Sequence, residues 1–305
     1  SVATFWLAET KEVVIMLIAI AGASGRTGHV AAQTLLARGA KVRVILRDAA
    51  KGEAWRGRGA EVALAALGDV PALTRALRGA DGAYLLIPPN FAAPSQREYQ
   101  QTLARAYAAA VAESGMPHLV FLSSFGAQHE KGGGPVDGLH AAEVLLRAAT
   151  RTRVSVIRAA YFYENVTPLL AVVKSAGLLP SFFPAQLPVP MVATHDVGIL
   201  AAELLLDAPK ASRIVELGTA RSSAEVGDVL GKLLGKPIAV QEAAIESIGP
   251  MLTGLGFTAD LAGLYVEMIA GIRSGKVAFE GGHRRVQAST PLEVSFRELL
   301  ASSER

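Results

Sequence analysis

The first half of the chain alternates short apolar runs with longer segments in which apolar residues recur at helical spacing. The apolar runs contain few polar positions, as expected of strands that are covered on both faces of a parallel sheet. Helical segments separate successive runs, and this order predicts right-handed βαβ units. We therefore predict an α/β fold with a doubly wound, Rossmann-type parallel sheet, whose strands lie at residues 16–21, 41–47, 61–65, 82–87, 118–124 and 154–160.

The pattern loosens after Asn165. Prolines and two adjacent phenylalanines occur within residues 178–198, which favours an irregular lining segment over a sheet. Thr194 precedes an apolar helical segment, and we expect it to be the N-cap. We predict a nucleotide-binding Rossmann domain at residues 16–165 and a smaller, mostly helical substrate lobe at 166–305, with some segments returning to the sheet. Residues 1–15 are interpreted as an extension.

Composition narrows the class of protein. Hydrophobic residues make up 51% of the 305 residues and charged residues 19%, enough apolar material for a sizeable core. The formal net charge of +3 is too small to indicate nucleic-acid binding. The sequence has no cysteine, which excludes disulfides and thiolate metal sites and fits a reducing compartment. We expect a cytoplasmic protein that acts on a small molecule, without a metal, a nucleic acid or a membrane as partner.

Three glycines separate the first strand from the first helix. Gly22, Gly25 and Gly28 form the pattern G-x-x-G-x-x-G at this junction. A helix N-terminus carries unpaired N–H groups and a partial positive charge, and a phosphate reaches them only where side chains are absent. The pattern indicates a dinucleotide-binding turn, to which Ser24, Arg26 and Thr27 also belong; the alternative is a glycine-rich turn without a ligand.

The end of the second strand indicates which dinucleotide. Arg47 ends the apolar run and Asp48 follows it. A guanidinium at this position suits a 2′-phosphate, with further charge from Lys51 and Arg26, so we favour NADP(H) over NAD(H). In the alternative, Arg47 is solvated and Asp48 binds the ribose. We expect Asp69 and Val70, which follow the third strand, to lie beside the adenine.

Five segments in order, GASGRTG, VRVILRD, YLLIPP, LVFLSS and VIRAAYFYEN, resemble the NmrA-like group of atypical short-chain dehydrogenases/reductases. Within that group the chain is most similar to the bacterial NADPH-dependent quinone reductases. The resemblance extends from about Met16 to the end of the chain, with few diagnostic residues in the last third. It implies a Rossmann domain, a smaller lobe and a cleft between them at the nicotinamide. The group also includes nucleotide-sensing regulators, so the resemblance alone does not fix catalysis.

The resemblance assigns further residues. Ile87 and Pro88 match the end of the fourth strand near the ribose and nicotinamide, and Ser123 matches the strand end that carries a catalytic serine in typical members. The wider superfamily has Tyr-x-x-x-Lys on the following helix, but this chain has His140 and Val144 in those two positions. Without that pair, ketone reduction with a tyrosine as proton donor is not supported.

The remaining candidates concern the acceptor. Quinone reduction yields an aromatic hydroquinone anion, so the protein mainly has to position the acceptor and exclude water. We expect Phe91, Tyr161, Phe162 and Asn165 to contact the substrate, Tyr161 also to contact the cofactor, and His140 to donate a hydrogen bond or proton. The leading hypothesis is an NADPH-dependent oxidoreductase acting on quinone-like or other electron-poor molecules. The alternative is a non-catalytic NADP(H) sensor that signals through a partner protein. A homodimer is a further possibility.

Overall fold

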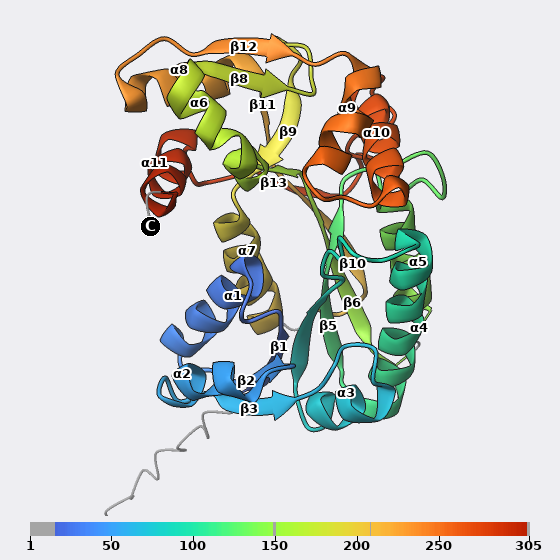
Figure 1. Ribbon diagram of the computed structural model, residues 1–305. Coiled ribbons are helices and arrows are strands. Elements are labelled where there is room, and N and C mark those ends of the chain that lie inside the picture. Colours follow the sequence, from blue (N-terminus) through green and yellow to red (C-terminus); the bar gives the residue numbers. More distant parts are fainter. Residues whose placement is uncertain (1–15, 149–150, 208, 304–305) are drawn as a thin grey trace, which may run out of the picture.

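A parallel eight-stranded sheet forms the centre of the computed structural model, which describes residues 16–148, 151–207 and 209–303 (Figure 1). The segment 1–15, interpreted above as an extension, lies outside the described residues. Every neighbouring pair of strands in this sheet is parallel. Across the sheet the order is β13 (Arg284–Val286), β10 (Arg213–Leu217), β6 (Arg153–Ala159), β5 (His118–Ser124), β4 (Gly82–Leu86), β1 (Leu17–Ala21), β2 (Lys41–Leu46) and β3 (Glu61–Leu64).

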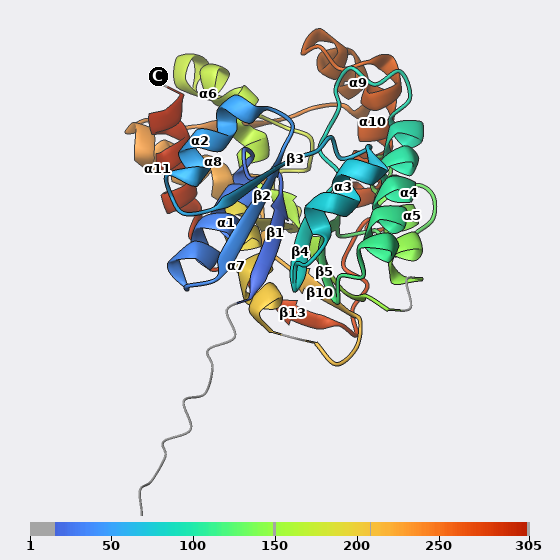
Figure 2. The same ribbon diagram turned by 90° about the horizontal axis from the view of Figure 1, so that it is seen from below.

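Helices cover both faces of this sheet, and Figure 2 shows it between two helical layers. On one face α1 (Arg26–Ala37) packs against α7 (Thr194–Leu206), and Gly198 of α7 lies where a Cβ would meet Val30 and the carbonyl of Thr27. On the other face lie α3 (Val70–Leu77), α4 (Gln96–Ser114) and α5 (Val136–Arg147). Each face has its own buried apolar cluster. The prediction of a doubly wound Rossmann-type fold is confirmed.

The later part of the chain forms a layer above the carboxyl edge of the sheet, with a third apolar cluster of its own (Figure 1). It contains two small sheets, β11-β9-β7 and β12-β8. Its strands are β7 (Tyr161–Phe162), β8 (Leu178–Ser181), β9 (Val189–Val192), β11 (Thr219–Arg221) and β12 (Ala239–Glu242). Its helices are the 3₁₀-helix η2 (Tyr163–Leu169), α6 (Leu170–Ala176), α8 (Ser223–Leu234), α9 (Ile245–Gly254), α10 (Ala259–Arg273) and α11 (Leu292–Ser302).

Two local expectations are wrong. Residues 178–198 are not irregular throughout, because β8 and β9 lie within them; Pro180 sits in a two-stranded sheet, where an edge strand tolerates a missing N–H. Thr194 is not the N-cap of α7, since Ala193 occupies that position. The Thr194 amide donates instead to Oε1 of Glu164 at 2.9 Å, as does the Thr194 hydroxyl at 2.5 Å. The Glu164 carboxylate, which comes from another segment, therefore accepts a hydrogen bond from a backbone N–H at the start of α7.

Candidate functional site

The turn between β1 and α1 gives each of its three glycines a different environment. Gly22 has φ +69°, a left-handed conformation that favours glycine. A Cβ on Gly28 would come within 2.6 Å of the Ala21 and Gly22 carbonyl oxygens, so Gly28 allows α1 to pack on β1. A Cβ on Gly25 would meet only the Gly22 oxygen, at 3.3 Å. Gly25 is exposed and is the N-cap of α1, so its open side is where a phosphate can approach the amides.

The start of α1 is electropositive. No side chain among the described residues caps its first amides. Ser24 and Arg26 are exposed beside Gly25, whereas Thr27 is buried and its hydroxyl accepts a 2.9 Å hydrogen bond from Tyr84. The Thr27 side chain therefore holds the helix on the sheet, and only its backbone is available to a ligand.

The end of β2 places a cation near this turn. Arg47 and Lys51 are exposed and form no ion pair within the described part of the chain. Asp48 is the N-cap of η1 (Ala49–Gly52), and its carboxylate accepts from the Ala50 amide at 2.9 Å. The Asp48 carboxylate, which would bind the ribose in the alternative given above, therefore has a local structural role. The Arg47 guanidinium beside it is available for an anion.

The remaining cofactor candidates lie at the carboxyl ends of β3 and β4. Asp69 caps α3 through the Ala72 amide at 3.0 Å, and Val70 begins that helix. Ile87 follows β4 and is part of the cleft described below. The Pro88 carbonyl accepts a 3.1 Å bond from the Tyr99 hydroxyl. All these residues lie along the edge of the sheet that also carries the glycine turn, where doubly wound folds bind ligands.

An open cleft with a cavity volume of about 330 Å³ lies over the carboxyl ends of β4, β5 and β6. Its wall contains Phe91, Tyr161, Phe162 and Asn165, the four predicted substrate contacts, together with Ser123. Burial raises the pKa of Tyr161 well above its usual value, an effect that the Asn165 side chain partly opposes. Other residues of the wall are Leu86, Ile87, Pro89, Gln96, Gln100, Leu122, Ser124, Phe125, Pro135, Val136, Leu139, Ala159, Ala160, Leu261, Tyr265 and Met268.

Ser123 belongs to a buried network below this cleft. Its hydroxyl donates to Oε1 of Glu143 at 2.5 Å, and both residues are 3% exposed. Arg158 donates to both oxygens of Glu143, at 3.1 and 2.8 Å, and to Glu280 at 2.5 Å. Burial alone would lower the pKa of Arg158, but hydrogen bonds and charge from Glu143 and Glu280 raise it. Because the Ser123 hydroxyl donates its hydrogen bond to Glu143, it can only accept a hydrogen bond from a ligand.

His140 lies beside the cleft and not in its wall, where α5 contributes Val136 and Leu139. Its Nδ1 lies 2.8 Å from the Ala127 carbonyl oxygen, which assigns the proton to Nδ1. Val144 is 56% exposed on α5. The structure thus groups Ser123, Tyr161, Phe162 and Asn165 in one cleft and keeps His140 and Val144 outside it.

Sequence reasoning missed the far wall of the cleft. Gln96 is buried, and its Oε1 has no hydrogen-bond partner within the described residues. The backbone N–H of Gln96 donates to the Asp260 carboxylate at the start of α10 at 2.8 Å, which brings Tyr265 and Met268 of α10 over the cleft. Gln96 is the first residue of α4, and its polar side chain lies on the buried face of that helix. This is the one feature of the sequence that could have indicated the far wall. An unpaired amide oxygen in a ligand-sized cleft is a group left for a polar ligand.

These features, a bare helix start at a glycine turn and an apolar cleft at the same sheet edge, are typical of nucleotide-binding α/β proteins with a small-molecule site. Residues 16–266 match the NmrA-like family, and the chain belongs to that family.

Three of the known proteins with similar sequence or structure are reductases. A curated relative from Streptomyces griseus, (4-alkanoyl-5-oxo-2,5-dihydrofuran-3-yl)methyl phosphate reductase, is 26% identical over 242 residues, covering 76% of this chain and 78% of the relative. The Escherichia coli NADPH-dependent quinone oxidoreductase QOR2, solved with NADPH, is 22% identical with a TM-score of 0.76, over 93% of this chain and 99% of that one. Citrobacter triphenylmethane reductase, solved with NADP(H), is 18% identical with a TM-score of 0.78, over 92% and 99%. The expectation of NADP(H) agrees with these complexes.

No helix within the described residues is both long enough and apolar enough to cross a bilayer. The same residues contain no group of three or more histidine, aspartate or glutamate side chains placed to hold a metal ion.

Proposed function

We propose that this protein is an NADPH-dependent oxidoreductase that transfers hydride to quinone-like or other electron-poor small molecules. One observation carries the proposal. The open helix start at Gly25 and Arg47, which has no ion pair among the described residues, lie on the same sheet edge as an aromatic cleft of ligand size. The three reductases reported above support it, since their names specify a quinone, a triphenylmethane dye and an alkanoyl furanone phosphate.

The residues around the turn fit the cofactor. Gly25 leaves room for the diphosphate over the α1 amides, and Arg47 with Lys51 would hold the 2′-phosphate. NADPH, when bound, supplies the hydride. In this proposal Ser123 accepts a hydrogen bond from the nicotinamide carboxamide, because its own proton is directed to Glu143.

The acceptor site needs little acid catalysis. Tyr161, Phe162 and Phe91 would stack on or enclose a flat acceptor and exclude water. The side-chain Oε1 of Gln96 would accept a hydrogen bond from a polar group of that acceptor. His140 is bonded to Ala127 outside the cleft wall, so we assign protonation of the reduced acceptor to solvent. A hydroquinone anion is stable enough for this, whereas a simple ketone reduction would lack its proton donor.

Steady-state oxidation of NADPH tests the proposal. The purified protein is assayed with a quinone, a triphenylmethane dye and an alkanoyl butenolide, each at several concentrations. We expect saturable turnover with at least one of them and a preference for NADPH over NADH. Rates no higher than those without protein, for all acceptors, would rule out catalysis.

A second candidate is a non-catalytic NADP(H) sensor acting through a protein partner. The observation in its favour is that the Ser123 hydroxyl and the His140 Nδ1 are both engaged within the protein, so neither offers a proton to the cleft. Tight binding of NADPH without turnover, together with a partner whose affinity differs between NADP⁺ and NADPH, would favour this candidate.

A further inference from the structure

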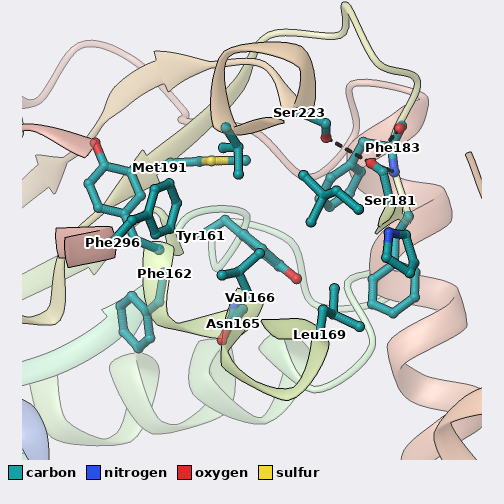
Figure 3. Close-up of a pocket in the computed structure, with 15 residues that line it drawn as sticks. Tyr161, Phe162, Asn165, Val166, Leu169, Ser181, Phe183, Met191, Ser223 and Phe296 are labelled. Carbon is teal, nitrogen blue, oxygen red and sulfur yellow. Dashed lines mark hydrogen bonds between the residues drawn. The ribbon is translucent and has the colours of Figure 1, made fainter. Parts of the chain in front are cut away.

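A second pocket adjoins the cleft and shares three wall residues with it, Tyr161, Phe162 and Asn165 (Figure 3). Its cavity volume is about 50 Å³, which is room for a short apolar group and not for a whole small molecule. The η2 segment, β8, β9 and the starts of α8 and α11 enclose it. The residues found only in this pocket are Tyr163, Val166, Leu169, Leu179, Pro180, Ser181, Phe182, Phe183, Met191, Ser223, Val226 and Phe296.

The two serine hydroxyls of this pocket are already engaged inside the protein. The Ser181 and Ser223 hydroxyls are 2.7 Å apart, and Ser181 also donates to the Phe183 carbonyl at 2.7 Å (Figure 3). The Tyr163 hydroxyl is buried and has no hydrogen-bond partner among the described residues; burial raises its pKa, and the nearby Arg221 opposes that rise. What faces the interior is aliphatic and aromatic, and Phe183 packs edge-on against Tyr161 at 5.3 Å between ring centroids. Such a pocket favours an apolar ligand group.

We infer that this pocket is a subsite for an apolar substituent of the acceptor, a short alkyl group attached to the electron-poor ring. The inference rests on the proposed function, since it places the reacting ring in the cleft. Tyr161 stands at the boundary between the two spaces, so a ring stacked in the cleft beside Tyr161 directs a substituent past Asn165 into the pocket. The preferred acceptors are therefore lipophilic quinone-like molecules, and small unsubstituted rings are poor substrates.

Chain length is the measurable consequence. Burying one methylene in a preformed apolar pocket improves binding by up to about fourfold, so kcat/KM should rise with each added carbon and level off once the pocket is full. The series to use is 1,4-benzoquinones with one ring pattern and a straight alkyl chain of increasing length. The readout is the ratio of kcat/KM for a long-chain to a short-chain quinone, measured within one variant, so that a general loss of activity cancels.

Leu169→Trp and Val166→Trp each fill the pocket from η2. Both residues are partly exposed and lie outside the cleft wall, so the larger side chain is tolerated without rebuilding the core. The matched control is Val172→Trp on α6, at a side chain that is 42% exposed and faces neither space. We expect the chain-length ratio to fall at least tenfold in the two pocket variants and to stay unchanged in the control. A wild-type ratio near one, or equal ratios in all three variants, would overturn the subsite.

A binding measurement separates this inference from the proposed function. Calorimetric titration of the NADP⁺-loaded protein with 4-alkylphenols of increasing chain length needs no turnover. Affinity that rises with length in the wild type and the control but not in Leu169→Trp supports the subsite, even if no quinone is reduced. Affinity independent of length overturns it, even if short quinones are good substrates.

Discussion

Arg47 is the residue on which the choice of cofactor depends. Replacing Arg47 with Ala removes an exposed guanidinium that has no ion pair within the described residues, while Asp48 still caps η1. We expect NADPH to bind about tenfold to a hundredfold more weakly, the usual value of a hydrogen-bonded charge pair, and NADH to bind as before. Calorimetric titration with both nucleotides measures the two affinities.

A matched control is Arg38→Ala at the far end of α1, where the side chain is also exposed and lies 3.7 Å from Glu203. It should leave both affinities unchanged, because it removes the same charge away from the turn. Equal losses for NADPH and NADH in Arg47→Ala would contradict the 2′-phosphate assignment.

At the scale of elements, α1 allows cofactor binding and folding to be tested separately. A Cβ at Gly28 would lie 2.5–2.6 Å from backbone oxygens that cannot move without shifting β1, so Gly28→Ala should destabilise the fold and lower Tm. A Cβ at Gly25 meets one oxygen at 3.3 Å, so Gly25→Ala should fold with a nearly unchanged Tm. It should nonetheless weaken NADPH binding at least about tenfold, because the methyl group occupies the approach to the amides.

Thermal unfolding and nucleotide titration of both variants check this expectation. Full NADPH affinity in a folded Gly25→Ala variant would show that the diphosphate does not lie over the start of α1. An unchanged Tm in Gly28→Ala would show that the contact between α1 and β1 is looser than the structure indicates.

The elements of the Rossmann part were predictable because each carries a local signal. Continuous apolar runs such as Ile18–Ala21 specify strands that are covered on both faces, and the three glycines mark the turn after the first of them. The contacts Glu164–Thr194 and Ser123–Glu143 were not predictable. They join residues that are 30 and 20 positions apart, respectively, and such contacts leave no periodic pattern in the sequence. The strands at 178–181 and 189–192 were missed because their prolines are tolerated only in small sheets, which sequence does not reveal.

At the scale of the molecule, the cleft is assembled from parts far apart in sequence. Ser95–Gln96 at the start of α4 meets Asp260, 164 residues later, and the loop carrying Phe91 meets Phe257 with ring centroids 5.0 Å apart. The candidate site could therefore be predicted only on its Rossmann side, where the strand ends define it. Its far wall depends on how α9 and α10 pack over the sheet. The last third of the chain has no sequence motif that indicates this packing.

A buried histidine, His118, lies at the opposite edge of the sheet from the cleft and makes the stability of the fold depend on pH. His118 begins β5, is 4% exposed, and its Nε2 lies 3.0 Å from the Ser155 hydroxyl. The pKa of His118 is lowered from 6.5 to about 4, mainly by burial and also by the charges of Arg213 and Arg153, while the charge of Asp207 opposes them. Between pH 6.5 and 4 the unfolded chain therefore binds a proton at this position that the folded protein does not. The free energy of unfolding must fall as pH falls through this window, by up to about 3 kcal/mol from this residue.

His118→Gln removes the titrating group while keeping a side chain that can bond Ser155, which Arg213 also holds at 3.0 Å. We expect urea unfolding at a series of pH values to give a shallower acid loss of stability in this variant than in the wild type. The difference should develop between pH 6.5 and 4 and vanish above pH 7. His195→Gln, on a side chain that is 59% exposed, is the control for replacing a histidine. Parallel stability curves for wild type and His118→Gln would mean that the buried imidazole is already protonated in the fold, because then folding would release no proton from this position.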